Sequence, residues 1–266
     1  MKKPFLLLAI GVMLQACSVK ENRGPCPCLM SVITADAFAS VADNPDTEWK
    51  LTLTGFTEEG KIVEESFGLE GVQDTLEFPV KKGSLVMTAW LTGADTQVTD
   101  GRWIIPAGEQ AQAFFACRET VDASGETVCC RLQPHKHYST ITLLDGSGTG
   151  KPFGGQTLRV RGLSCGLDLT TMQPVEGTFE CLATASETLS GQGYQVRIPR
   201  QDGPSLELEL IPKEAGIATS RLDLGEVLFA QPFTPADEEM PDYIVWLSAT
   251  GTSATVASVI TVRPWK

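Results

Sequence analysis

The side chains with the most chemical potential in this chain are its eight cysteines and two histidines. His135 and His137 stand two residues apart, a spacing that places both on one side of a β-strand, where they could bind a metal ion. No third candidate ligand stands nearby in the sequence. The pattern therefore favours a structural pair, and we expect neither a bound metal nor a cofactor.

Cys26-Pro27-Cys28 could form a redox dithiol, but redox pairs usually have CxxC spacing at the start of a helix, and a strand-like run follows here. A structural tether is the favoured interpretation. The glycine-rich stretch 146–150 lacks the lysine of a phosphate-binding loop, and a Ser/His/Asp triad would have to use one of only two histidines. We therefore expect no catalytic residues, no enzymatic activity and no small-molecule substrate.

The first residues are typical of an export signal. Lys2 and Lys3 precede an apolar run, Phe5–Leu14, that has about half of the ~20 residues needed by a membrane-spanning helix. The run ends in Leu14-Gln15-Ala16-Cys17, which resembles the bacterial lipobox, although Gln15 departs from its usual small or aliphatic residue. We expect Cys17 to become the lipidated first residue, held stably at a membrane by several acyl chains, palmitate among them. The alternative is an ordinary secretory signal with an incidental cysteine.

Charge and cysteine content fit an exported product. The formal net charge is −12 and no cluster of lysine or arginine follows the signal, which argues against a nucleic-acid partner. Cysteines in an exported chain predict disulfides. If Cys17 carries lipid, an odd number remains, so at least one thiol is free or pairs with another chain. The candidates are Cys26, Cys28, Cys117, Cys129, Cys130, Cys165 and Cys181.

Hydrophobic periodicity predicts an all-β fold. Apolar and polar residues alternate in the four segments 49–54, 158–161, 194–198 and 206–210, and a period of two places one set on a buried face. More continuous apolar runs predict strands that are buried more deeply. They cover residues 85–91, 141–144, 243–247 and 256–262. Turn signals separate these segments, and β-sandwiches are the expected architecture.

The domain organisation follows from the turns and prolines. Residues 1–16 form the expected signal peptide and 17–28 a lipidated tether. Pro134 cannot continue a central strand, so we place the boundary between an N-terminal sandwich, 29–133, and a C-terminal sandwich, 134–266. The glycines of 145–150 are interpreted as a hairpin loop within the second half.

The expected hairpins also suggest disulfides. A four-residue turn at 122–125 would set Cys117 opposite Cys130, or opposite Cys129 if the register shifts by one residue. Cys165 and Cys181 similarly flank a turn. Buried free thiols are the alternative for each of these cysteines.

Together, Cys17, the Cys26-Pro27 pair, the strand that follows it, the "HKHYSTITLL" start of the second half and the chain end "VITVRPWK" resemble the fimbrillin-associated anchor lipoproteins of Bacteroidia. The resemblance implies two transthyretin-like β-sandwiches and a lipid anchor in the outer membrane, facing the cell exterior. It also implies a non-catalytic minor subunit that attaches a fimbrillin shaft to the cell and limits its length.

Two other functions are weighed against this one. A surface glycan-binding lipoprotein would need exposed aromatic rings, but Trp49, Trp90 and Trp246 lie inside strand patterns, and Trp103 alone lies in a polar stretch. A secreted hydrolase would need a catalytic set that the sequence lacks.

The last strand is the candidate for binding the shaft. It is uncharged and rich in β-branched residues, so at a sheet edge it could pair with a strand of another subunit. The alternative is that it completes the second sandwich. Its residues are Thr255, Val256, Ala257, Ser258, Val259, Ile260, Thr261 and Val262.

The lipid anchor gives the first prediction. Replacing Cys17 with alanine removes the thiol that accepts the lipid, so we expect the protein to move from the detergent phase to the aqueous phase in a Triton X-114 partition. A Cys28→Ala variant is the matched control and should stay in the detergent phase. Unchanged partitioning of Cys17→Ala would contradict lipidation at this residue.

Overall fold

The computed structural model describes most of the chain after the expected tether. The described residues are 27–34, 41, 48–68, 73–93, 96–146, 153, 156–188, 191–201, 203–214, 216, 218–228, 239–250 and 253–262. No helix in this part of the chain is both long enough and apolar enough to cross a membrane.

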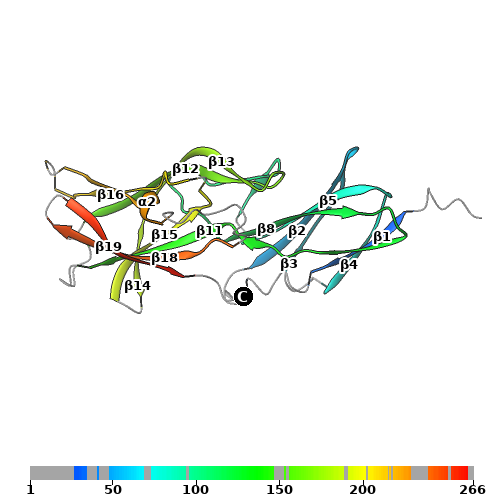
Figure 1. The fold of residues 1–266 in the computed structure, drawn as a ribbon, viewed down its shortest axis with the longest axis horizontal. Coiled ribbons are helices and arrows are strands. Elements are labelled where there is room, and N and C mark those ends of the chain that lie inside the picture. The colour runs from blue at the N-terminus through cyan, green and yellow to red at the C-terminus, as the bar shows by residue number, and fades with distance from the viewer. Residues whose placement is uncertain are drawn as a thin grey trace, which may run out of the picture.

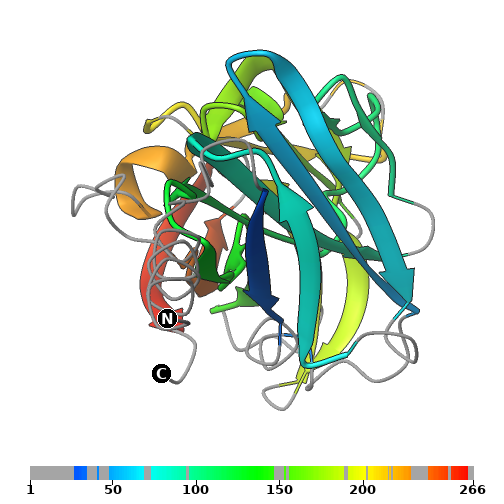
Figure 2. The same ribbon diagram turned by 90° about the vertical axis from the view of Figure 1, so that its right-hand side faces the viewer.

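Two β-sandwiches lie side by side along the long axis of the molecule (Figure 1). The N-terminal sandwich packs a three-stranded sheet of order β4-β1-β9 against a five-stranded sheet of order β10-β8-β5-β2-β3. Figure 2 views the molecule from this end and shows dark-blue β1 beside cyan β4. The strands are β1 (Cys28–Ile33), β2 (Trp49–Thr57), β3 (Gly60–Gly68), β4 (Thr75–Val80), β5 (Ser84–Gly93), β8 (Phe114–Asp122), β9 (Thr127–Arg131) and β10 (His135–Lys136).

The C-terminal sandwich is larger. One sheet has the order β14-β15-β11-β18-β19, and the other has the order β17-β16-β12-β7-β6, with β13 on the remaining edge of β12. The strands are β6 (Val98–Thr99), β7 (Arg102–Ile104), β11 (Tyr138–Asp145), β12 (Thr157–Asp168), β13 (Gln173–Leu182), β14 (Thr184–Thr188), β15 (Gly191–Pro199), β16 (Glu207–Ile211), β17 (Ser220–Asp223), β18 (Asp242–Thr250) and β19 (Ser253–Val262). A short helix, α2 (Leu224–Leu228), follows β17.

Alternation along the strands builds two separate hydrophobic cores. In β12, buried Leu158 and Val160 alternate with Arg159 and Arg161, which face outward, as expected for a strand with one face in the core. One core cluster fills the N-terminal sandwich and a second fills the C-terminal one. The all-β prediction is confirmed, and the expected strands over 49–54, 85–91, 158–161 and 194–198 are all present.

One segment of the first half belongs to the second sandwich. Between β5 and β8 the chain crosses over, and β7 pairs with the end of β12, with Leu167 opposite Trp103. The Trp103 indole is stacked on Phe114, with ring centroids 4.3 Å apart, and both rings lie in the C-terminal core. The sequence places these residues in the N-terminal sandwich, so the structure shows that a single cut at residue 133 does not separate the two cores. The boundary itself stays a prediction.

Two predicted hairpins are wrong. The loop after β11 does not return to a neighbouring strand, because β11 pairs with β15 and β18 while β12 belongs to the opposite sheet. The turn after β8 also passes from one sheet to the other, since β9 pairs in parallel with β1. In both places the turn residues are present, but the chain changes layer instead of reversing within one sheet.

The segment from His135 to Tyr138 joins the two sandwiches. Lys136, which is buried, donates from Nζ to Asp242 Oδ1 at 2.6 Å and from its backbone N–H to Glu239 at 3.0 Å. The Tyr138 ring packs against both cores and meets Phe115 edge-on at 5.8 Å. A buried ammonium must be paired to be tolerated, so these contacts hold the joint in one arrangement.

The crossing segment gives the second prediction. Replacing Trp103 with alanine removes a buried ring from the C-terminal core, and we expect the free energy of unfolding to fall by about 3–5 kcal/mol. The neighbouring Ile104, whose side chain is 45% exposed, is the matched control, and Ile104→Ala should cost less than about 1 kcal/mol. Urea denaturation followed by circular dichroism measures both variants. Equal losses in the two would contradict the assignment of Trp103 to this core.

Candidate functional site

The last described strand, β19, lies at the edge of its sheet. It pairs antiparallel with β18, with Ile244 opposite Ile260 and Asp242 opposite Val262. Within the described residues no second strand is hydrogen-bonded to it, although β17 and α2 also contact it. One row of its backbone N–H and C=O groups is therefore available to another strand. In Figure 1, β19 is the red strand beside β18.

The two faces of β19 differ. Val256 and Val259 point inward and pack against the C-terminal core. Ile260 and Val262 are on the outer side and are 51% and 44% exposed. The strand thus closes the core with one face and presents β-branched, apolar side chains with the other.

Two other edge strands, β3 and β17, carry charges. On β3, Lys61 pairs with Glu64 at 2.7 Å. On β17, Arg221 reaches Glu209 of the neighbouring strand at 3.2 Å. Charged side chains at an edge discourage pairing with foreign strands, and β19 has none between Thr255 and Val262. Among these edges, β19 is the one whose chemistry permits strand addition.

The sequence-based expectation for β19 is corrected in one respect. Residues 256–262 were expected to form a deeply buried strand, but most of them are exposed, because the strand is covered on one face only. A continuous apolar run does not distinguish a central strand from an uncharged edge strand. Both alternatives for this strand are compatible with its position, since it completes the core and leaves an edge unpaired.

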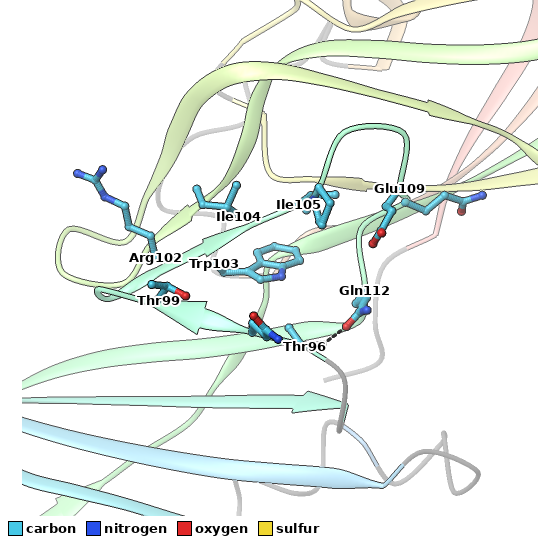
Figure 3. Close-up of a pocket in the computed structure, with 11 residues that line it drawn as sticks. Thr96, Thr99, Arg102, Trp103, Ile104, Ile105, Glu109 and Gln112 are labelled. Atoms are coloured by element: carbon cyan, nitrogen blue, oxygen red, sulfur yellow. Dashed lines mark hydrogen bonds between the residues drawn. The ribbon is translucent and has the colours of Figure 1, made fainter.

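A cavity of about 370 Å³ lies beside the β6–β7 hairpin. In Figure 3, the Glu109 carboxylate and the Gln112 amide lie near the Trp103 indole, while Arg102 points away. Arg102 is paired with Asp168 at 3.3 Å, so its charge is compensated outside the cavity. The size falls within the range of small-ligand sites.

Trp103 is not an exposed aromatic platform. The sequence left it as the one tryptophan available for stacking on a sugar ring, but the structure buries it to 2% exposure. The sequence contains a local signal for the hairpin that buries Trp103. Asp100-Gly101 has positive φ at both residues, 51° and 71°, which is the two-residue type I′ hairpin turn that Asp-Gly favours. An Asp-Gly turn at this position predicts a hairpin over residues 98–103, which is the hairpin that the structure contains.

Both histidines lie in the segment that joins the two sandwiches and form contacts there. His135 Nδ1 lies 3.4 Å from Glu239 Oε1, and His137 Nε2 lies 3.2 Å from the Ala116 carbonyl oxygen. Burial lowers the pKa of His137 to about 3, with the nearby Arg200 contributing in the same direction. His137 is therefore neutral at physiological pH. Among the described residues, no three His, Cys, Asp or Glu side chains are grouped so that they could hold a metal ion.

The neighbouring residues Cys129 and Cys130 lie on opposite faces of β9. Cys117 and Cys130 are buried in the same core cluster, one from each sheet, while Cys129 is exposed. Burial raises the pKa of Cys117 to about 12, and Cys130 adds to the rise. A bridge from Cys117 to Cys129 would require β9 to turn over, so Cys130 is the better partner. All three are free thiols in the structure, and the pairing stays a prediction.

The second expected pairing does not fit the register. Cys181 lies opposite Val160, which is five residues along β12 from Cys165. At about 3.3 Å per residue, this separation far exceeds the 4.4–6.8 Å between Cα atoms that a disulfide allows. The hairpin between Cys165 and Cys181 is present, but the predicted bridge across it is wrong.

The remaining candidates of the tether are Cys17, Cys26 and Cys28. Cys28 is the first residue of β1 and is buried. Cys17 and Cys26 lie outside the described residues, so lipidation and any bridge to Cys26 stay predictions.

Taken together, the fold is that of an all-β protein with two sandwich cores and an unguarded terminal edge. No family model and no curated protein sequence matches the chain. Solved structures do match it over most of its length. A candidate adhesin from Bacteroides thetaiotaomicron is similar at 14% identity, covering 90% of this chain and 99% of its own, with a TM-score of 0.59.

Two further structures have the same TM-score of 0.59. One is described as candidate polysaccharide-binding proteins from Bacteroides thetaiotaomicron, at 13% identity, with 89% of this chain and 98% of that chain covered. The other is the fimbrial anchor protein Mfa2 from Porphyromonas gingivalis, at 12% identity, with 89% and 97% covered. At these identities the likeness establishes a shared fold.

The buried histidine gives the third prediction. The unfolded chain takes up a proton at His137 near pH 6.5, whereas the folded protein does so only near pH 3. Between these values the unfolded state binds more protons, so stability is complete above pH 6.5 and falls with decreasing pH, by at most about 1.4 kcal/mol per pH unit.

A His137→Gln variant should lose this slope between pH 6.5 and about 4.5, before carboxylates begin to protonate. His135→Gln, at the half-buried neighbour, is the control and should retain it. Urea titrations at half-unit pH intervals measure the slope. The same pH dependence in wild type and His137→Gln would contradict the buried, neutral state of this ring.

Proposed function

We propose that this protein is a non-catalytic outer-membrane lipoprotein, exposed on the cell surface, that anchors a fimbrial shaft. The observation that carries the proposal is the edge of β19, which is uncharged and is hydrogen-bonded to no second strand among the described residues. A shaft subunit that adds a strand there would gain backbone hydrogen bonds along the whole contact. Ile260 and Val262 would then lose their exposure to water.

The fold comparison supports the proposal. The chain shares its architecture over nearly its full length with Mfa2, which is described as a fimbrial anchor protein. It shares the same architecture with a candidate adhesin. Both descriptions concern proteins on the outside of the cell, where a lipid on Cys17 would keep this chain.

The remaining parts of the proposal follow from the anchor role. The partner is a fimbrillin shaft subunit, and the acyl chains on Cys17 insert into the outer membrane with the protein facing outward. Because a subunit held by lipid at the base of a shaft ends its growth, the anchor also limits fimbrial length. No reaction is required for any of these steps.

The fourth prediction tests strand addition at β19. Lysines at Ile260 and Val262 place charges on the exposed side of the edge, where a partner strand would have to desolvate them. We expect the Ile260→Lys, Val262→Lys variant to fold normally and to carry fewer fimbriae, with more released into the medium. Electron microscopy and immunoblots of the culture supernatant measure the two quantities.

Ile62→Lys is the matched control, because Ile62 is also a half-exposed residue of an edge strand, β3, but lies in the other sandwich. It should leave the fimbriae attached.

Single cysteines at Val256 and Ala257, in a Cys129→Ser background, add a direct test by crosslinking to the first shaft subunit. Wild-type numbers of attached fimbriae on the double-lysine variant would exclude β19 as the contact.

A further inference from the structure

The cavity beside the β6–β7 hairpin has a polar lining that the anchor role does not use. Its walls carry amide and hydroxyl groups from Gln97, Gln112, Thr96 and Thr99, together with one carboxylate, Glu109, and Gln97, Thr99 and Glu109 are exposed to solvent. The Thr96 hydroxyl donates to the Gln112 amide oxygen, which leaves the Gln112 N–H groups for a ligand (Figure 3). Each neutral group can both donate and accept hydrogen bonds. This combination matches a ligand whose own groups are hydroxyls.

The apolar part of the cavity is small and rigid. Ile105 and the edge of the Trp103 indole contribute to the wall, and Trp103 is fixed by its parallel stacking on Phe114. A saccharide has apolar C–H faces as well as hydroxyls, and such faces pack on walls of this kind.

The loop 105–112, which lines the cavity, is held in place by the hydrogen bonds of Gln110. The Gln110 amide nitrogen donates to the Leu182 carbonyl oxygen at 3.0 Å and to Thr184 Oγ1 at 2.7 Å. Its oxygen accepts from the Arg197 backbone N–H at 3.0 Å. Gln110 is thus a positioning residue, and the loop 105–112 needs little reordering when a ligand binds.

From these contacts we infer that the cavity binds one neutral saccharide unit of a surface glycan. Glu109 accepts hydrogen bonds from a pair of ring hydroxyls, and Gln97 and Gln112 bind further hydroxyls. An anionic ligand is a poorer fit, because its charge would face the Glu109 carboxylate.

The site is separate from the contact proposed for the shaft. The cavity lies beside β6 and β7, and β7 pairs with residues 166–168 at the far end of β12. By contrast, β19 contacts β17, whose partner β16 pairs with residues 157–161 at the start of β12. Both sites can be occupied together, and either function can fail without the other.

Saturation-transfer NMR on the full-length lipid-free chain tests the site. The probes are D-glucose, D-galactose, D-mannose and N-acetyl-D-glucosamine. Glucuronate is an anionic counterpart that shares the glucose ring. We expect transfer from at least one neutral sugar and weaker transfer from glucuronate.

Two exposed-rim variants probe the cavity. Glu109→Leu removes the charged acceptor and should weaken binding about tenfold, and Gln97→Trp fills the space and should abolish transfer. Glu58→Leu, at an exposed carboxylate in the β2–β3 turn, is the control and should bind like wild type. The inference is overturned if no neutral sugar shows transfer, if glucuronate binds better than the neutral sugars, or if both cavity variants leave transfer unchanged.

Discussion

The ion pair between Lys136 and Asp242 is the contact on which the two-sandwich arrangement depends. It links β10, the last strand of the first sandwich, to the first residue of β18, a central strand of the second, at 2.6 Å. Around it, the His137 backbone N–H donates to the Phe114 carbonyl oxygen and the Arg200 N–H donates to the His137 carbonyl oxygen. A buried charge is tolerated only when it is paired, so the two halves have one favourable relative position.

The crossing of the chain between β5 and β8 strengthens this joint. Because Trp103 and Phe114 belong to the C-terminal core while β5 and β8 belong to the N-terminal sheet, the C-terminal half does not hold its full core without residues of the first half. The crossing segment also lines the cavity, so the segment that ties the sandwiches together supplies the polar groups of the inferred glycan site.

The contrast between faces explains where partners can bind. On the outer face of β12, Arg159 and Arg161 form ion pairs with Glu180 and Glu209, so this surface is saturated with its own charges. The outer side of β19 offers β-branched side chains and unpaired backbone groups instead. An uncharged edge of this length is the kind of strand to which another strand can pair.

The sequence by itself determined the strands and their buried faces, because a period of two depends only on residue type and order. Tertiary structure decided which strands are neighbours. The turns after β8 and β11 have the composition of hairpin loops, but the strands beside them pair with distant parts of the chain. β9 pairs with β1, and β11 pairs with β18. The same limit applies to the sites: the uncharged run at 255–262 was visible as a candidate partner strand, whereas its edge position, the burial of Trp103 and the cavity around Glu109 arise only when distant segments pack. Alternation specifies a face but carries no information about which strand lies beside it.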